Sequence, residues 1–385
     1  MKNIFKTLVL SAMIFSVQAF SQDGIRTMMV EKGNKLGLKT SDNSTLTIIR
    51  FDAKNRAYYL PFNDNSCIFF KDVPENTQAF ATWGEIYNLY DDLIFGKAQK
   101  GKDGRITRGK PQLFIGAPTS DEFKTPQKSG AGQHFEGGSI YWSQPTGAHE
   151  VHGSIRDKWK SLGLENSFLG FPTTDETSTP DGYGRFNFFE GGAIYYHPHL
   201  GTFAVPKMIV EVWKKNGWEK GKLGYPISDE IIKNNNSIQK FEFGAVISTK
   251  GGAYQVIYNG DKKARGLYTK WLETGAENSN LGDLLVPNRN YPKNQFQYFA
   301  EFQNGYIYES FIRQANGNTP LDAFVIRKGP IFDYYAKKKW EQGSLGLPIS
   351  DEIPSKKDGQ EMIEQHFQNG VIYYTKSIGA FEKKN

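Results

Sequence analysis

Cysteine is almost absent from this sequence, in which Cys67 is the single cysteine among 385 residues. An internal disulfide is therefore excluded. The fold must be held by packing alone, although an exported protein would have been free to use disulfides. A lone cysteine with no catalytic motif around it is best interpreted as a small buried hydrophobic residue.

Strong charge and long apolar runs are also missing. The chain has 47 basic and 41 acidic residues, which gives a net charge of +6, and most of its lysines are scattered. A charge this small gives no support for nucleic-acid binding, although weak attraction to anionic cell-wall polymers is compatible with it. Because no segment approaches about 18 unbroken apolar residues, the mature chain is not predicted to span a membrane.

The sequence motifs of common enzymes and metal sites are absent as well. There is no Gly-x-Ser-x-Gly nucleophile elbow, no phosphate-binding loop and no dinucleotide-binding fingerprint. The pairs His149/His152 and His197/His199 have no cysteine or acid that completes a zinc site. We therefore predict no catalytic residues, no metal and no cofactor.

Residues 1–21 have the pattern of a secretory signal peptide. Lys2 and Lys6 supply the positive region, residues 7–15 the apolar stretch, and the sequence before Gln22 suits cleavage. The pattern predicts a secreted protein in the periplasm, on the cell surface or outside the cell. Removal of the two lysines would lower the net charge from +6 to +4.

A repeated turn motif, Leu-Gly-x-Pro, is what the chain has in abundance. Its copies occupy residues 115–118 (with Ile first), 169–172, 223–226 and 345–348, and an Asp-Glu pair follows each after two variable residues. Pro118, Pro172 and Pro226 are 54 residues apart, whereas Pro348 follows after 122. Pro287 stands midway in that longer interval, in a degenerate copy without Asp-Glu. The chain therefore contains five units.

Each turn motif has the same neighbours. Upstream, an apolar residue and an aromatic residue four positions later predict the buried face of a short helix. Downstream, Phe-Glu/Gln-x-Gly before a run of β-formers predicts a hairpin, because Gly-Gly and Asn-Gly favour tight turns. The helix pairs are Ile86/Tyr90, Ile155/Trp159, Ile209/Trp213, Leu267/Trp271 and Ile331/Tyr335.

These patterns predict an α+β fold of five tandem helix–turn–β-hairpin repeats, at about residues 82–150, 151–205, 206–262, 263–326 and 327–385. One helix and one hairpin cannot bury their apolar faces alone, so neighbouring units must stack. Residues 22–81 are predicted to form a β-rich cap or a decayed half-unit. The Lys/Gly-rich residues 96–109 are predicted to form a mobile surface loop.

The sequence Leu-Gly-Phe-Pro-Thr-Thr-Asp-Glu at 169–176, with Phe189 to Tyr195 downstream, resembles the LGFP repeat family. The resemblance covers about residues 82–382 and is weakest around Pro287. In that family, tandem repeats occur in secreted or cell-wall-associated bacterial proteins, attached to esterase, mycoloyltransferase or amidase domains, and are thought to bind cell-wall polymer. No such enzyme domain is expected before these repeats. The resemblance implies a compact, propeller-like ring with pseudo-fivefold symmetry, with an open superhelical array as the alternative.

Two sets of residues are candidate ligand contacts. Exposed aromatic rings offer sugars a flat face, although the rings could instead pack between units. The Asp-Glu pairs could contact a polar ligand or a cation, but the interpretation with most weight is that they bond the local backbone. The aromatic candidates are Tyr141, Trp142, Tyr195, Tyr196, Tyr308, Tyr373 and Tyr374; the acidic ones are Asp121, Glu122, Asp175, Glu176, Asp229, Glu230, Asp351 and Glu352.

The leading hypothesis for function is a secreted, non-catalytic repeat protein that binds cell-envelope glycan, with peptidoglycan or another cell-wall polysaccharide as its partner. The second is a secreted protein-interaction scaffold or effector with a protein partner. The third is a hydrolase, which would need clustered titratable groups that the sequence does not show.

Overall fold

A computed structural model of the chain describes residues 21–38, 45–50, 56–62, 65–71, 78–249, 251–291, 294–311, 320–357 and 359–382. The predicted signal peptide, apart from Ser21, lies outside these residues. The chain divides into two compact units, Met1–Gly153 and Ser154–Asn385. Among the described helices, none is long and apolar enough to cross a membrane.

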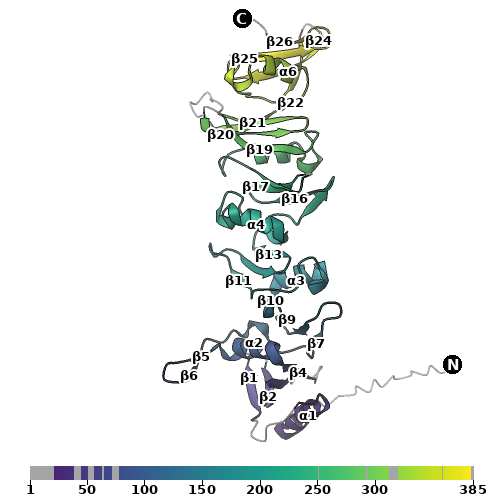
Figure 1. The fold of residues 1–385 in the computed structure, drawn as a ribbon, viewed down its shortest axis with the longest axis vertical. Helices are drawn as coiled ribbons and strands as arrows, with labels where there is room; N and C mark the ends of the chain where they lie inside the picture. Colours follow the sequence, from purple (N-terminus) through teal and green to yellow (C-terminus); the bar gives the residue numbers. More distant parts are fainter. Residues whose placement is uncertain are drawn as a thin grey trace, which may run out of the picture. The chain divides into compact units, whose positions relative to one another are not determined.

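The repeating element is a four-stranded antiparallel sheet whose strands pair in chain order (Figure 1). The first unit holds the sheets β1 (Thr47–Arg50), β2 (Arg56–Phe62), β3 (Ser66–Lys71), β4 (Ala79–Trp83) and β7 (Phe123–Lys124), β8 (Ala131–His134), β9 (Gly138–Ser143), β10 (Gly147–His152). The second unit holds four: β11 (Thr177–Ser178), β12 (Arg185–Phe189), β13 (Gly192–His197), β14 (Gly201–Pro206); β15 (Ile231–Lys233), β16 (Asn236–Lys240), β17 (Gly244–Ser248), β18 (Tyr254–Tyr258); β19 (Leu284–Tyr291), β20 (Asn294–Phe302), β21 (Gly305–Phe311), β22 (Leu321–Arg327); and β23 (Ile353–Lys357), β24 (Gln360–Phe367), β25 (Gly370–Thr375), β26 (Gly379–Glu382).

A short helix follows the last strand of five of these sheets, and a 3-10 turn then leads into the turn motif. The apolar and aromatic members of all five predicted helix pairs are buried, which confirms the helical spacing. The helices are α2 (Gly84–Phe95), α3 (Gly153–Leu162), α4 (Lys207–Lys215), α5 (Leu267–Glu273) and α6 (Pro330–Lys337), and the 3-10 turns are η1 (Leu113–Ile115), η2 (Leu164–Asn166), η3 (Trp218–Lys220), η4 (Ala276–Asn278) and η5 (Trp340–Gln342).

The α+β class is therefore correct, but the predicted hairpin is only the centre of each sheet. A short strand before it and a further strand after it complete the four. The first strand of a sheet has as few as two residues, as in β7 and β11, which is too short to show alternation. No described sheet closes into a barrel, and the five-unit ring is not confirmed.

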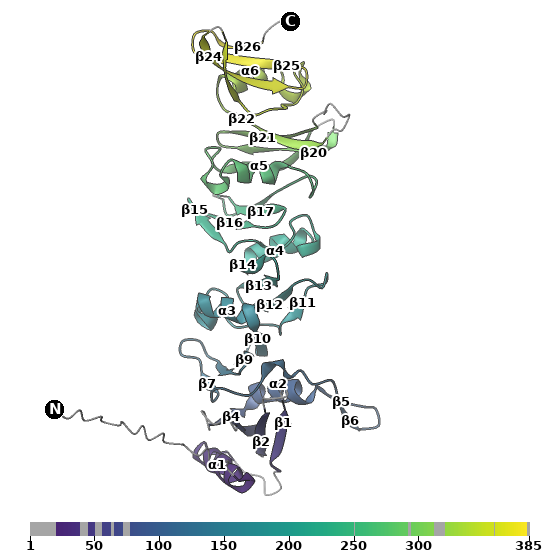
Figure 2. The same ribbon diagram turned by 180° about the vertical axis from the view of Figure 1, so that it is seen from behind.

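The N-terminal segment is not purely β, because it begins with helix α1 (Gln22–Lys35). The Ser21 hydroxyl accepts a hydrogen bond from the Gly24 N–H at 3.2 Å and caps the helix. Ile25 and Met29 are fully buried in a cluster with residues of β2, β3 and β4. Sheet β1–β4 then leads into α2 as the later sheets lead into theirs, so its topology matches that of a repeat unit (Figure 2).

The turn motif is held from two sides. The glycine of every copy has a positive φ, between +70° and +74°. The residue after it donates its N–H to the Glu or Gln of the Phe-Glu/Gln-x-Gly segment, as Tyr225 does to the Glu242 carboxylate at 2.9 Å. In three copies the aromatic residue of the preceding helix donates to the glycine carbonyl: Tyr90 to Gly116, Trp213 to Gly224 (3.1 Å) and Tyr335 to Gly346. Helix, turn and hairpin are thereby joined by hydrogen bonds as well as by packing.

This arrangement predicts that Gly224→Ala is strongly destabilising. A Cβ at this position would lie 2.7 Å from the Glu242 carboxylate, on a backbone with φ of +74°. We expect a loss of about 3 kcal/mol in unfolding free energy, the sum of left-handed strain and overpacking. Gly182→Ala is the matched control, because Gly182 has φ of +81° with open space around its Cβ, so about 1 kcal/mol is expected. Equal losses in chemical denaturation would contradict the account.

Candidate functional site

The aspartate of the Asp-Glu pair joins consecutive sheets. Asp229 accepts a hydrogen bond from the Ala204 N–H of β14 at 2.9 Å and forms an ion pair with Lys158 of α3. Asp351 does the same with the Val325 N–H of β22, at 2.8 Å, and with Lys270 of α5. In the first unit, Asp121 accepts from the Ala81 N–H of β4 at 2.8 Å and pairs with Lys32 of α1 at 2.8 Å.

A buried amide completes this contact. Gln365 donates to the Val325 carbonyl at 2.9 Å and to the Ser350 carbonyl at 3.0 Å. Gln239 and Gln133 make the same pair of bonds in their units. The outward N–H and C=O at the edge of each preceding sheet are therefore both bonded by side chains of the next unit. Exposed sheet edges invite unwanted pairing, and this contact blocks them.

In the degenerate unit a different residue bonds the edge strand of the preceding sheet. It lacks the Asp-Glu pair, and Ala300 stands where the other units have Gln or Asn. Asn288 alone accepts from the Tyr258 N–H at 3.0 Å and donates to the Tyr258 carbonyl at 2.6 Å. One side-chain amide thus replaces a carboxylate and an amide.

The glutamates of the pairs point to other partners. Glu122 accepts from the Trp83 N–H at 3.3 Å, and Glu176 lies 3.5 Å from the Arg185 guanidinium. Glu230 accepts from the Ser237 hydroxyl. Burial raises the pKa of Glu122 to about 7 and also raises the pKa of Glu352. Asp175 is exposed, and its backbone carbonyl accepts from the Thr177 hydroxyl at 3.1 Å. A ligand role for these acids stays a prediction.

The first tyrosine of each predicted pair faces a packed interior or its edge. Tyr141, Tyr195 and Tyr308 are at most 3% exposed. Tyr195 lies edge-on to Trp213 of α4, with ring centroids 4.6 Å apart, so no ligand could stack on it without moving that helix. Tyr373 is half-buried and stacks on Phe381, with centroids 5.8 Å apart.

The second aromatic position is more accessible. Trp142, Tyr196 and Tyr374 are each half-buried, as Tyr373 is. Trp142 and Tyr374 pack in part against the core clusters of their sheets, which leaves the rest of each side chain to solvent. The corresponding residues of the other two sheets are buried and bonded to backbone: Ser248 accepts from Ser237, and Glu309 accepts from Gly260, Leu267 and Tyr298. The aromatic candidates are therefore confined to three of the five units.

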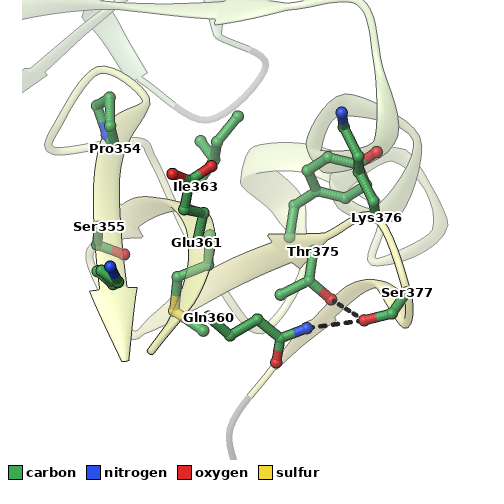
Figure 3. Close-up of a pocket in the computed structure, with 11 residues that line it drawn as sticks. Pro354, Ser355, Gln360, Glu361, Ile363, Thr375, Lys376 and Ser377 are labelled. Carbon is green, nitrogen blue, oxygen red and sulfur yellow. Dashed lines mark hydrogen bonds between the residues drawn. The ribbon is translucent and has the colours of Figure 1, made fainter. Parts of the chain in front are cut away.

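Tyr374 is the member of this set that lines a large groove. The groove has a volume of about 810 Å³ and lies on the last sheet, between residues 354–356 of β23, residues 360–363 of β24 and residues 374–377 at the end of β25 (Figure 3). Pro354, Ile363 and Tyr374 are directly paired across the three strands, so they form one row on the same face. The next cross-strand pair, half-buried Ser355 and Met362, also lines the groove from the alternate side-chain positions of β23 and β24.

Polar groups surround this lining. Lys356, Glu361 and Lys376 are exposed at the rim, so both signs of charge are available there. The Gln360 amide donates to the Ser377 hydroxyl at 2.8 Å, and this hydroxyl lies 3.3 Å from that of Thr375 (Figure 3). The network holds a row of donors and acceptors beside an apolar strip. Sequence reasoning found Tyr374, but Ile363 and Met362 carry no motif that would have predicted the groove.

The histidines do not assemble a metal centre in the described part of the chain. His149 contacts the Thr146 carbonyl at 3.0 Å, and His152 contacts the Glu150 carboxylate at 2.7 Å. The rings of His197 and His199 have centroids 5.8 Å apart. No group of three metal-ligating side chains was found among the described residues.

Comparison with known families identifies the repeat. The family model described as "LGFP repeat" matches residues 115–167, 169–221 and 223–279. Residues 115–279 therefore contain three LGFP repeats. The matched segments begin at the turn motif, so the family's repeat runs from one turn motif to the next 3-10 turn.

Comparison with solved structures gave only distant likeness, and no match was found among curated proteins. The extracellular domain of a one-component system from B. thetaiotaomicron is 12% identical, with a TM-score of 0.14, over 90% of this chain and 37% of that one. A mutant of Aleuria aurantia lectin, solved with Fucalpha1-6GlcNAc, is 10% identical, with a TM-score of 0.14, over 90% of this chain and 96% of that one. TM-scores this low carry no argument about fold or function.

The buried amide gives a direct test of the contact between units. Gln365→Ala would leave the Val325 and Ser350 carbonyls without their buried donor. We expect a loss of about 2 kcal/mol in unfolding free energy, measured by denaturant titration. Gln342→Ala, at an exposed position in η5, is the control and should change stability by less than about 0.5 kcal/mol. Indistinguishable variants would show that the amide is not needed.

The raised pKa of Glu122 predicts a pH-dependent effect. An acid whose pKa rises to about 7 on folding contributes stability below its unfolded pKa, and this contribution is lost as pH rises through 7. Glu122→Gln should therefore be more stable than the parent above pH 7, by about 1 kcal/mol after allowance for partial exposure, and equal to it near pH 4. Melting temperatures against pH, with exposed Glu31→Gln as control, measure this. A difference that does not vary with pH would refute the assignment.

Proposed function

We propose that the protein is a secreted, non-catalytic LGFP-repeat protein that binds a cell-envelope glycan in the groove on its last sheet. The observation that carries the proposal is the combination of Tyr374, an apolar strip and a hydrogen-bonding rim in a groove of about 810 Å³. A sugar ring has an apolar C–H face and a border of hydroxyls. It therefore fits a surface with an apolar strip and a hydrogen-bonding rim.

In this proposal, apolar residues of the groove contact the sugar ring and rim residues form hydrogen bonds with its substituents. Tyr374 and Ile363 are cross-strand neighbours that can lie under the face of a sugar ring. Gln360, Ser377 and Glu361 lie where hydroxyl or acetamido groups of the same ring would need donors and acceptors. An open groove suits a chain that continues beyond the site at both ends, as a polymer does, better than an isolated small molecule.

The half-buried rings of Trp142 and Tyr196 supply further contacts in this proposal. Each would be weak alone, because a single half-buried ring offers a sugar only a small contact area. Several weak contacts on one polymer strengthen one another through effective concentration. Secretion, proposed from residues 1–21, would bring the repeats to the envelope where such polymers lie.

The proposal predicts that the mature chain, residues 22–385, co-sediments with insoluble peptidoglycan at both low and high salt. Tyr374→Ala and Gln360→Ala should each weaken binding about tenfold, because one removes the ring and the other the rim amide. Tyr183→Ala is the matched control, since Tyr183 is 72% exposed and lies outside the groove. Its binding should not change.

A further variant and the pattern of co-sedimentation distinguish glycan binding from its alternatives. Tyr374→Phe keeps the ring and should retain most of the binding, which distinguishes stacking from a loss of folding. Absence of co-sedimentation at either salt concentration would reject peptidoglycan as the ligand. Binding that all variants retain would reject the groove. Capture of a protein ligand through the same residues would favour the interaction-scaffold alternative.

A further inference from the structure

A second surface of interest is a basic hairpin in the first unit. Strands β5 (Ala98–Lys100) and β6 (Ile106–Arg108) pair antiparallel between α2 and the first turn motif. Both views show this hairpin standing away from the sheets and from α2 of its own unit (Figure 1 and Figure 2). Every residue from 97 to 112 is exposed, so the segment adds nothing to the core.

The hairpin is an insertion relative to the other repeats. Six or seven residues separate the helix from the turn motif in the later units, whereas residues 96–114 fill this place in the first. The later units use a tight corner with a left-handed residue, such as Gly163 or Gly217. Since the corner suffices to build a repeat, the inserted strands are not required by the fold.

Its base is fixed by specific contacts. The Gly109 N–H donates to the Lys97 carbonyl at 3.0 Å, and a Cβ on Gly96 would collide with the Gly109 carbonyl. The Arg108 guanidinium lies 2.7 Å from Asp91 and 5.4 Å from the Phe95 ring centroid. The segment predicted as a mobile surface loop lies on the surface but contains a paired hairpin, because the close approach of two glycines allows strands to pair here.

The charge of this arm is concentrated. Residues 97–110 contain six basic residues and one acid, a net charge of +5 in a chain whose total is +6. Arg108 is neutralised by Asp91, and Arg105 lies 3.6 Å from Asp103 at the exposed tip. The four lysines have no carboxylate among the ion pairs found in the described chain. They are Lys97, Lys100, Lys102 and Lys110.

We propose that this hairpin is a docking arm for an acidic polysaccharide. The lysines are spaced along the hairpin, with Lys97 and Lys110 at its base, Lys100 on β5 and Lys102 in its turn. Their ammonium groups match carboxylates spaced along a polymer. A membrane-binding arm would pair its cations with bulky apolar or aromatic residues, and a single-strand nucleic-acid site would supply rings for base stacking. Residues 97–112 contain no aromatic residue, and Ile106 is the one large exposed apolar residue among them.

This inference does not depend on the proposed groove. The arm belongs to the compact unit Met1–Gly153 and the groove to Ser154–Asn385. Ligand binding at the two places should respond differently to salt. Exposed ion pairs are screened over about 8 Å at physiological ionic strength, so the arm should lose its ligand as salt rises. Stacking in the groove should persist.

The experiment uses the mature chain, residues 22–385, with polygalacturonate as the probe and neutral pullulan as its control. Binding is followed by affinity electrophoresis and isothermal titration calorimetry at several salt concentrations. The test variant changes Lys97, Lys100, Lys102 and Lys110 to Gln. The matched control removes the same charge from exposed helix positions, by changing Lys160, Lys214, Lys215 and Lys337 to Gln.

We expect salt-sensitive binding to polygalacturonate and none to pullulan. The arm variant should bind at least about tenfold more weakly, while the control variant should stay within about twofold of the parent. An equal loss in both variants would show that net charge, and not the arm, is responsible. Failure to bind polygalacturonate, or arm-dependent binding confined to anionic vesicles or DNA, would also overturn the proposal.

Discussion

The structure depends on hydrogen bonds that side chains of one repeat make to the edge strand of the preceding sheet. A strand at a sheet edge exposes N–H and C=O groups that need partners. Ala204 of β14 is an example. Its N–H donates to the Asp229 carboxylate, and its carbonyl accepts from the Gln239 amide. The same carboxylate pairs with Lys158, so one aspartate joins its own turn to both α3 and β14. Stacking of repeats is thus specified by directed hydrogen bonds in addition to apolar contact.

Once this contact is fixed, several residues of the repeated motifs are already used within the fold. The acids that look most like a binding motif are engaged within the fold, and tyrosines such as Tyr195 lie beneath helices. Among the aromatic candidates, Tyr374 is partly exposed beside the groove on the last sheet. The basic arm is a separate addition to one unit. Its exposed lysines lie in a segment that has no aromatic residue.

The sequence predicted features that depend on local spacing. Ile209 and Trp213 are four residues apart and share a buried helix face, and the turn glycine Gly224 has the positive φ that its motif requires. Features that depend on distant partners were not predicted. Asp229 meets residues 25 and 71 positions earlier in the chain, which no local pattern records.

Helix α1 and the groove were missed for related reasons. The buried residues of α1 include only two large side chains, Ile25 and Met29, which is a weak helical signal. The groove is formed by Ile363 and Met362, ordinary strand residues that acquire a role only because of the strands beside them. The paired glycines Gly96 and Gly109 could have indicated a close approach, but glycine in a lysine-rich segment is equally typical of a loop.

The most direct test of the central claim is hydrogen–deuterium exchange of the mature chain with and without soluble peptidoglycan fragments. The account predicts slower amide exchange in residues 354–356, 360–363 and 374–377, which line the groove on the last sheet. These segments should respond while the turn motifs do not. Protection confined to other segments, or none at saturating ligand, would contradict glycan binding at this site.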